Sequence, residues 1–320
     1  MSAEFDLIRR HFSRPAPGAT LGVGDDAALL DLSPGNQLAV TTDTLVAGVH
    51  FLTDVQPAAL GWKAAAVNLS DLAAMGARPR WLTLALTLPQ ADDNWLAEFA
   101  RGFYDCAAAA GAELVGGDTT QGPLSITVTA MGEIGPGRAL RRNAARPGQD
   151  IWVSGELGDA ALGLAALRGE ILADLADQAV LLSRLTLPQP RNALGIALTM
   201  GLASACIDVS DGLLADLGHI LTASATGAVL RWPDIPLSAA ARHFSQMGDF
   251  ATRVLAGGDD YELCFTADVA RRSDLDKLAG RLGVRLTRIG EITALPGLHL
   301  LDETGREMTR SQSGYAHFNA

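Results

Sequence analysis

The sequence predicts an α+β protein with two domains, and three observations support this prediction. The chain has 320 residues, whereas a single domain commonly has about 100–200. Helical and strand patterns alternate along it, but without the regular train of βα units that builds one doubly wound sheet. A segment rich in Gly, Pro and Arg interrupts the chain near its middle. We therefore expect one domain over residues 1–137 and a second over residues 148–320.

The first half begins with a short amphipathic helix and a loop. Residues 1–12 fit the helix, and residues 13–24 hold several prolines and glycines that favour a loop. Pro57 suits the first turn of a long Ala-rich helix, and Gly111 should end the next helix. The expected helices of this half after the first are 57–75 and 92–110, and the expected strands are 38–42, 81–88, 113–115 and 124–134.

The second half continues the alternation of helices and strands. Pro188 and Pro190 should break the chain between two of its helices. The expected helices are 158–167, 175–185, 192–200 and 212–224, and the expected strands are 150–154, 205–209, 228–231, 262–265 and 285–291.

Composition and charge exclude several classes of protein. Hydrophobic residues make up 48% of the chain, which is enough for a sizeable core. The net charge of −11 argues against a general nucleic-acid binder, which would carry a basic surface. No signal peptide is visible, and every apolar stretch is shorter than the roughly 20 residues of a membrane span. Three widely spaced cysteines exclude a CxxC site, so we expect a cytoplasmic protein with no membrane partner.

Aspartates occur where strands are expected to end or turns to be tight. In GVGDDAALL, Asp25 and Asp26 are adjacent, so at most one of them can point into a shared site. Thr41, Thr42 and Asp43 lie at the end of a short expected strand, and their hydroxyl, carboxylate and backbone oxygens suit Mg²⁺. The alternatives are a polar surface turn at the first segment and a capping cluster at the second.

Two further aspartates stand in settings that favour metal or phosphate binding. Asp71 lies in an Ala- and Leu-rich helix, where a carboxylate is costly unless it is paired or binds a metal. Lys63, two turns earlier, is the alternative partner. Asp118 follows Gly116 and Gly117 at the end of an expected strand, where exposed backbone N–H groups can bind phosphate together with its metal.

The second half offers a similar segment and a cluster of arginines. Asp208, Ser210 and Asp211 precede an expected helix, where a plain N-cap is the alternative. Arg142 ends the densest cationic cluster and suits bidentate phosphate contact, with an exposed linker as the alternative. A lone histidine such as His50 is more often structural than a ligand contact. Walker, GxSxG, HExxH, EF-hand and protein-kinase motifs are all absent.

Together these segments resemble the thiamine-monophosphate kinase family, which belongs to the aminoimidazole ribonucleotide synthetase superfamily. The resemblance covers nearly the whole chain. Its motifs are GVGDDAALL (22–30), TTDTLVAGVHF (41–51), AVNLSDLAAMGARP (66–79), LVGGDTT (114–120), CIDVSDGLLADLGHI (206–220) and GGDDYELCF (257–265).

The resemblance implies transfer of the γ-phosphoryl group of ATP to thiamine monophosphate, assisted by several Mg²⁺ ions and without a covalent nucleophile on the protein. It also implies an N-terminal domain of one sheet plus helices that forms a homodimer, and a C-terminal α/β sandwich that completes the site. The implied metal ligands are Asp26, Thr41, Thr42, Asp43, Asp71, Asp118, Asp208 and Asp211. The implied ATP contacts are Gly117, Asp118, Arg142 (a phosphate clamp) and Ser210, and the implied substrate contacts are His50, Asp259 and Tyr315.

Two departures from the family pattern leave questions open. The family's GGEDYEL reads GGDDYEL here, which shortens the side chain at Asp259 by one methylene. Residues 99–104 hold no secure match for an aromatic nucleotide contact. Another ATP-using enzyme of the superfamily, or a non-catalytic nucleotide-binding module, remains an alternative. A selenophosphate synthetase would carry a reactive cysteine near its N-terminus, whereas the first cysteine here is Cys106.

Overall fold

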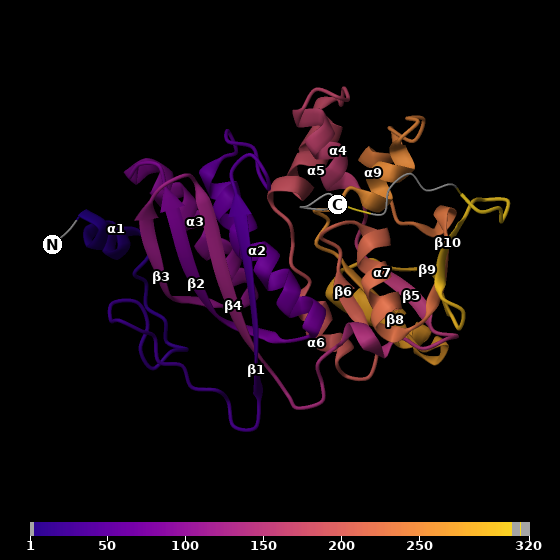
Figure 1. Ribbon diagram of the computed structural model, residues 1–320, viewed down its shortest axis with the longest axis horizontal. Helices are drawn as coiled ribbons and strands as arrows, with labels where there is room; N and C mark the ends of the chain where they lie inside the picture. The colour runs from indigo at the N-terminus through magenta and orange to yellow at the C-terminus, as the bar shows by residue number, and fades with distance from the viewer. Residues whose placement is uncertain (1–2, 309–313, 315–320) are drawn as a thin grey trace. The chain divides into compact units, whose positions relative to one another are not determined.

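The computed structural model describes residues 3–308 and residue 314 (Figure 1). The chain divides into two compact units, each described by itself below. Unit 1 comprises Met1–Leu72 and Ala77–Gly137, and unit 2 comprises Ala73–Gly76 and Arg138–Ala320. Both units contain a sheet and helices, so the prediction of a two-domain α+β protein is confirmed. Within the described residues, no helix combines the length and apolar composition needed to cross a membrane.

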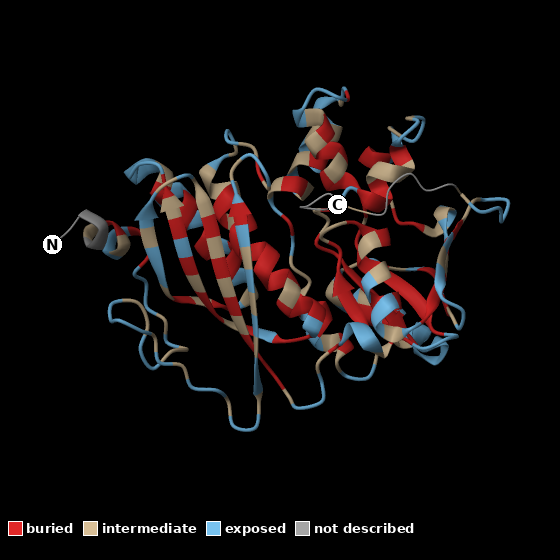
Figure 2. Cartoon of the chain, in the orientation of Figure 1, coloured by how far each residue is buried: buried red, intermediate tan, exposed pale blue. Residues whose placement is uncertain are grey.

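Unit 1 is built on a four-stranded sheet in the order β1-β4-β2-β3, so β1 and β3 form its two edges. Buried residues alternate with more exposed ones along most of β2 and β4, as the banding in Figure 2 shows, and half-buried residues alternate with exposed ones in β1. One face of the sheet packs on helices and the other stays open. The elements are α1 (Ala3–His11), β1 (Gln37–Val46), α2 (Pro57–Met75), β2 (Arg78–Leu88), α3 (Asp93–Ala110), β3 (Glu113–Gln121) and β4 (Ser125–Ile134).

Two glycines bring α2 and α3 into close contact. A Cβ at Gly61 would lie 2.0 Å from the carbonyl oxygen of Phe99, and one at Gly102 would lie 1.8 Å from that of Ala58. Only glycine fits at either crossing, which explains the single interruption in the Ala-rich sequence of α2. The side chain of Asp92 caps α3 by accepting hydrogen bonds from two backbone N–H groups in its first turn.

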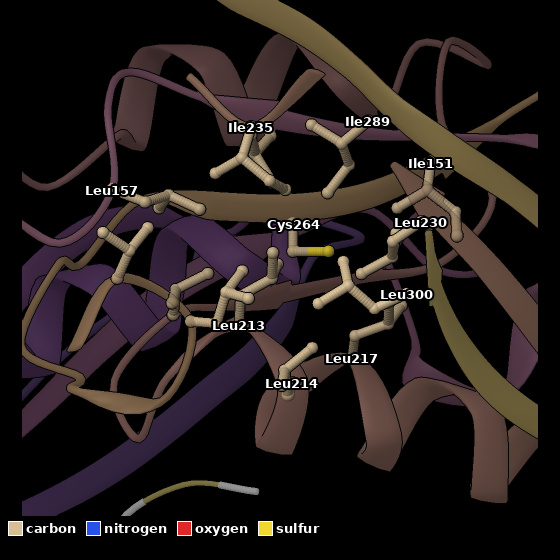
Figure 3. Close-up of a cluster of buried hydrophobic side chains, with 14 of the residues drawn as sticks. Ile151, Leu157, Leu213, Leu214, Leu217, Leu230, Ile235, Cys264, Ile289 and Leu300 are labelled. Carbon is tan, nitrogen blue, oxygen red and sulfur yellow. The ribbon is translucent and has the colours of Figure 1, made fainter. Parts of the chain in front are cut away.

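Unit 2 contains a six-stranded sheet in the order β10-β7-β9-β5-β8-β6. Its strands are β5 (Asp150–Ser154), β6 (Cys206–Asp208), β7 (Gly227–Arg231), β8 (Leu263–Ala267), β9 (Leu286–Thr293) and β10 (Gly297–Leu301). Its helices are α4 (Asp159–Leu167), α5 (Leu175–Thr186), α6 (Asn192–Leu198), α7 (Leu213–Ser224), α8 (Ala239–Arg242), α9 (Phe250–Ala256) and α10 (Arg272–Leu282). Buried aliphatic residues from the strands and from α7 form its core, shown in Figure 3.

The strands β1 and β3 are longer than the sequence predicted. The expected strand ended at Thr42, but β1 continues through Asp43 and Thr44 to Val46, because its residues pair with β4 along its whole length. Gly116–Asp118 were expected to end a strand, but β3 continues past them to Gln121 after a bulge. The sequence analysis also missed α8, α9, α10 and β10.

Candidate active site

The corner between β1 and α2 brings three of the predicted site residues together. The hydroxyl of Thr41 donates a hydrogen bond to the carboxylate of Asp71. Two residues further along β1, the backbone N–H of Asp43 donates to the Oδ1 atom of Asn68, at 2.9 Å. Asn68 is buried in α2, one turn before Asp71. The corner therefore presents hydroxyl and carboxylate oxygens from two elements that are fixed to each other.

The side chain of Thr42 lies on the other face of the sheet. Its hydroxyl is 2.9 Å from that of Thr129, and the hydroxyls of Thr44 and Thr127 are 2.8 Å apart. This follows from the two-residue period of a strand, which points neighbours to opposite faces. The structure therefore does not bring the Thr42 hydroxyl to Asp43.

His50 follows β1 in a tight turn. Its Nδ1 atom accepts a hydrogen bond from the backbone N–H of Val46, at 3.0 Å. An accepting Nδ1 requires the neutral tautomer with its proton on Nε2. The ring orientation is thus set by the turn itself.

Asp118 is exposed on the edge strand β3, beside a bulge in which Val115 is the extra residue. The bulge brings Gly117 so close to β2 that a Cβ there would lie 1.9 Å from the carbonyl oxygen of Leu84. Gly117 also has φ +153, so a glycine is required. A cavity of about 40 Å³ opens here, lined by Ile8, Phe12, Val23, Leu84, Leu114, Gly116, Gly117, Asp118 and Thr119.

Asp26 lies in an exposed turn of the Gly-rich segment. Its backbone N–H donates to the Oδ1 atom of Asp25, at 2.9 Å. One carboxylate of the adjacent pair is therefore engaged locally, which leaves Asp26 as the member that can reach a ligand.

In unit 2 a second acidic loop, residues 208–212, connects β6 to α7. Asp208 is 4% exposed at the end of β6. The N-cap of α7 is Gly212, which makes no side-chain cap bond, so neither Ser210 nor Asp211 has the capping role considered above. Instead the backbone N–H groups of Ser210 and Asp211 both donate to the Oδ2 atom of Asp216, at 3.0 Å each. The carboxylate of Asp216 therefore fixes the backbone of this loop.

Asp216 is a site residue that the sequence analysis missed. It is 3% exposed, and burial raises its pKa to about 7, while the backbone hydrogen bonds oppose that shift. The signal was present in the sequence, because Asp216 stands among leucines in the first turns of a helix. A buried carboxylate at such a position needs donors, and the preceding loop supplies them.

The segment before β8 is bonded to this acidic loop. The backbone N–H of Asp259 donates to the carbonyl oxygen of Ser210, at 2.8 Å, and that of Tyr261 donates to Val209, also at 2.8 Å. Asp259 and Tyr261 have φ +64 and +49, a left-handed conformation that is costly for a bulky residue. Non-glycine residues keep such angles where the surroundings enforce them, often at functional sites.

Arg142 and Tyr315 are the remaining residues that the sequence predicted for the site in unit 2. Arg142 is exposed in a short 3₁₀ helix, Arg142–Ala144, and its carbonyl oxygen accepts a hydrogen bond from Ser224, at 2.8 Å. Tyr315 lies outside the described residues. The neighbouring Gly314 is described, and a Cβ there would lie 2.8 Å from the carbonyl oxygen of Asp211. The chain just before Tyr315 thus reaches the acidic loop.

The donor chemistry of the β1–α2 corner fits Mg²⁺, which prefers hydroxyl and carboxylate oxygens. Among the described residues of either unit, no three His, Cys, Asp or Glu side chains lie close enough together to form a metal site by themselves. The corner instead combines the hydroxyl of Thr41 with the carboxylates of Asp43 and Asp71. These residues lie at most 30 positions apart in the sequence.

Comparisons with known proteins place these features in a family. Residues 24–134 match the AIR synthase related protein N-terminal domain, and residues 146–303 match the C-terminal domain of the same proteins. The thiamine-monophosphate kinase of Escherichia coli is 47% identical over 320 residues, covering 98% of each chain. This chain belongs to the thiamine-monophosphate kinase family.

Solved structures of this kinase family share the fold. The thiamine-monophosphate kinase of Stenotrophomonas maltophilia superposes with a TM-score of 0.85 at 49% identity, covering 92% of this chain and 94% of that one. AaThiL complexed with AMPPCP and TMP superposes with a TM-score of 0.79 at 30% identity, covering 98% and 96%. The family expected from the motifs is therefore confirmed.

Proposed function

We propose that this chain transfers the γ-phosphoryl group of ATP to thiamine monophosphate and so forms thiamine diphosphate. The observation that carries the proposal is the β1–α2 corner, where Thr41, Asp43 and Asp71 present oxygens suited to a metal–triphosphate complex. Full-length relatives named thiamine-monophosphate kinase support it. So does a solved relative complexed with an ATP analogue and TMP.

The phosphate of the acceptor is already a nucleophile, so the protein has to position two anions rather than remove a proton. The backbone N–H groups at Gly117 and the guanidinium of Arg142 are suited to phosphate oxygens. Ser210 lies in the loop that Asp216 holds, which would fix its approach to ATP. His50, Asp259 and Tyr315 would bind thiamine monophosphate. No side chain needs to carry the phosphoryl group.

Magnesium is the metal that this donor set fits. Thr41, Asp43 and Asp71 would hold it in unit 1, with Asp26, Thr42 and Asp118 as further ligands, and Asp208 and Asp211 would hold it in unit 2. Bound Mg²⁺ would neutralise the negative charge of the phosphates during transfer. These residues supply oxygen atoms only, as a hard cation requires.

We also propose a cytoplasmic homodimer formed by unit 1. The open face of β1 exposes Leu38, Val40 and Val46, which are 43%, 57% and 37% exposed, between threonines. Apolar residues spaced by two along an edge strand are typical of a surface that another sheet covers. Sedimentation of the purified protein tests this state, with a monomer at micromolar concentration as the contrary result.

A substrate panel tests the proposed reaction. The purified chain is given ATP and Mg²⁺ with thiamine monophosphate, with formylglycinamidine ribonucleotide or with selenide, and products are separated by chromatography. Thiamine diphosphate should form with the first acceptor alone. Product from either other acceptor would assign the chain to another reaction of the superfamily, and ADP formation in no case would favour a non-catalytic nucleotide-binding module.

A further inference from the structure

Asp259, a proposed contact for thiamine monophosphate, lies in the short segment 258–262 that precedes β8. We call these residues the Asp259 segment. Gly258, Asp259 and Tyr261 have φ +72, +64 and +49. Glycine adopts such left-handed angles readily, whereas the Cβ atoms of Asp259 and Tyr261 make them unfavourable. The segment therefore keeps this backbone conformation only because neighbouring groups hold it.

The acidic loop holds one side of the Asp259 segment through the main chain. The backbone N–H groups of Asp259 and Tyr261 donate to the carbonyl oxygens of Ser210 and Val209, at 2.8 Å each. In return, the backbone N–H of Val209 donates to the carbonyl oxygen of Glu262, also at 2.8 Å. These three bonds engage the backbone of the segment, and its side chains have further partners in unit 2.

The carboxylate of Glu262 is held by two donors of one guanidinium group, that of Arg191. The Nε atom of Arg191 donates to the Oε2 atom at 2.6 Å, and its Nη2 atom donates to Oε1. The side chains of Arg191 and Glu262 are 15% and 3% exposed, so little water competes for this contact. Arg184 also faces Glu262, but its Nη1 atom is 3.9 Å from Oε1, beyond hydrogen-bond distance. Arg191 rather than Arg184 therefore orients Glu262.

The end of β5 is shaped around the same carboxylate. The hydroxyl of Ser154 donates to the Oε2 atom of Glu262 at 2.5 Å, and it accepts a hydrogen bond from the backbone N–H of Leu263 at 2.9 Å. Gly155 has φ +60, and a Cβ there would lie 2.0 Å from the Oε1 atom of Glu262. Only glycine leaves room for the carboxylate that Arg191 binds.

Asp260 anchors the segment at a second point. Its Oδ1 atom accepts a hydrogen bond from the backbone N–H of Gly158, the N-cap of α4, at 2.9 Å. The first N–H groups of a helix have no partner within the helix, so a carboxylate is favourable there. The residues on both sides of Tyr261 are thus bonded through their side chains to other parts of unit 2.

We propose that Arg191 is a positioning residue for thiamine monophosphate, because through Glu262 it keeps the Asp259 segment in the backbone conformation from which Asp259 binds the substrate. The proposal rests on the proposed function, in which Asp259 is a substrate contact. Arg191 does not have to touch the substrate for this role. The acidic loop has its own support from Asp216, so magnesium and ATP should depend less on Arg191 than thiamine monophosphate does.

Titration calorimetry with Arg191→Lys tests this role, because lysine keeps the charge but cannot bind a carboxylate through two arms. Thiamine monophosphate is titrated in the presence of AMPPCP and Mg²⁺, and AMPPCP is titrated separately. The dissociation constant of thiamine monophosphate should rise on the order of 10–100-fold, because small displacements of a binding group have effects of this size. That of AMPPCP should stay nearly unchanged. Equal rises for both ligands, or wild-type affinity for thiamine monophosphate, would overturn the proposal.

Glu262→Gln is the second variant, and it carries the same test if Arg191→Lys does not fold. It keeps the shape of Glu262 and removes the charge that Arg191 binds, so it should show the same selective loss of affinity for thiamine monophosphate. Unchanged affinity in Glu262→Gln would also overturn the proposal. A wild-type chain that binds AMPPCP but no thiamine monophosphate would instead refute the proposed function.

The matched control is Arg272→Lys, at a similar ion pair elsewhere in unit 2. Arg272 donates from Nε and Nη2 to the two carboxylate oxygens of Asp150, at 2.6 and 2.7 Å, and the Asp150 side chain is 2% exposed. Arg272→Lys should lower the melting temperature and leave the affinity for thiamine monophosphate unchanged. A loss of affinity equal to that of Arg191→Lys would show that any weakened ion pair in unit 2 has this effect, and would overturn the proposal.

A double-variant cycle tests whether Arg191 acts through Asp259. In a chain that already carries Asp259→Asn, the side chain that Arg191 positions is impaired, so Arg191→Lys should weaken the binding of thiamine monophosphate little further. If the fold-changes of the two single variants multiply instead, Arg191 acts independently of Asp259, and the positioning role is wrong.

Discussion

The hydroxyl of Thr41 donates a hydrogen bond to the carboxylate of Asp71, across 30 residues of sequence. This contact connects the edge strand β1 to helix α2, and the hydrogen bond from the Asp43 backbone to Asn68 is a second connection between them. A carboxylate among apolar helix residues is costly unless it has a donor or a cation. Thr41 supplies such a donor to Asp71, which is half-buried in α2.

Replacement of Asp71 by Asn separates a metal ligand from a structural ion pair. As a ligand, Asp71→Asn should lose on the order of 10²–10³ in turnover, or about 3–4 kcal/mol, and keep its melting temperature. The remaining turnover should need more Mg²⁺. Melting and turnover across a magnesium titration provide the measurement, with Asp105→Asn on the exposed side of α3 as the control.

The ion-pair alternative has the reverse signature. If Asp71 were paired with Lys63 in the interior, its loss should cost about 3–5 kcal/mol of stability. A sharp fall in melting temperature, with an unchanged magnesium dependence of turnover, would support that alternative and exclude the metal role.

Substitution of Gly258 should disrupt the acidic loop of unit 2. Gly258 has φ +72, and a Cβ there would lie 2.4 Å from the carbonyl oxygen of Ser210. Gly258→Ala should therefore cost about 1–3 kcal/mol of stability and weaken turnover as well. Gly280→Ala, in α10 with open space around it, should instead stabilise by about 0.5–1 kcal/mol. Urea unfolding measures both, and equal effects at the two positions would contradict the close contact.

Asp150 should make the stability of unit 2 depend on pH. Burial alone would raise the pKa of its carboxyl, but hydrogen bonds from Arg272 and Arg288 outweigh burial and lower it. The stabilisation is then present above the unfolded pKa of about 3.9 and is lost as the pH falls below it. Asp150→Asn should cost about 1–3 kcal/mol at pH 7 and progressively less toward pH 3. Melting curves across this pH range measure the effect, with exposed Asp276→Asn as the control. A stability difference between Asp150→Asn and the wild type that does not change with pH would refute the ionic role.

Tyr315 should contribute to the binding of thiamine monophosphate but not to the binding of ATP. Its neighbour Gly314 approaches the acidic loop, and an aromatic ring over the thiamine heterocycle would contribute about 0.5–2 kcal/mol. Tyr315→Ala should raise the KM for thiamine monophosphate and leave the KM for ATP nearly unchanged, whereas Tyr315→Phe should retain most of the affinity. Equal changes in both KM values would make Tyr315 a folding residue.

The local signals in the sequence predicted much of this fold, and they failed where tertiary pairing decides. Pro57 and Gly111 mark helix ends through their own backbone preferences, and the structure has both ends where they stand. The glycines of β3 concealed a strand, because its continuation depends on pairing with β2 across a bulge. Asp43 and Asp118 lie on opposite edges of one sheet, and the spacing of residues in the sequence does not reveal this because it depends on strand order and register. The support that Asp216 gives the acidic loop is equally hidden, because it depends on burial.

The central claim is that thiamine monophosphate accepts the γ-phosphoryl group of ATP directly at this site. The most direct measurement is ADP release by the purified protein with ATP and Mg²⁺, with and without thiamine monophosphate, alongside γ-labelled ATP to follow the phosphoryl group. We expect ADP release to require thiamine monophosphate, one label to enter thiamine diphosphate for each ADP, and no label to remain on the protein. ADP release independent of thiamine monophosphate, or a stable labelled protein, would contradict the account.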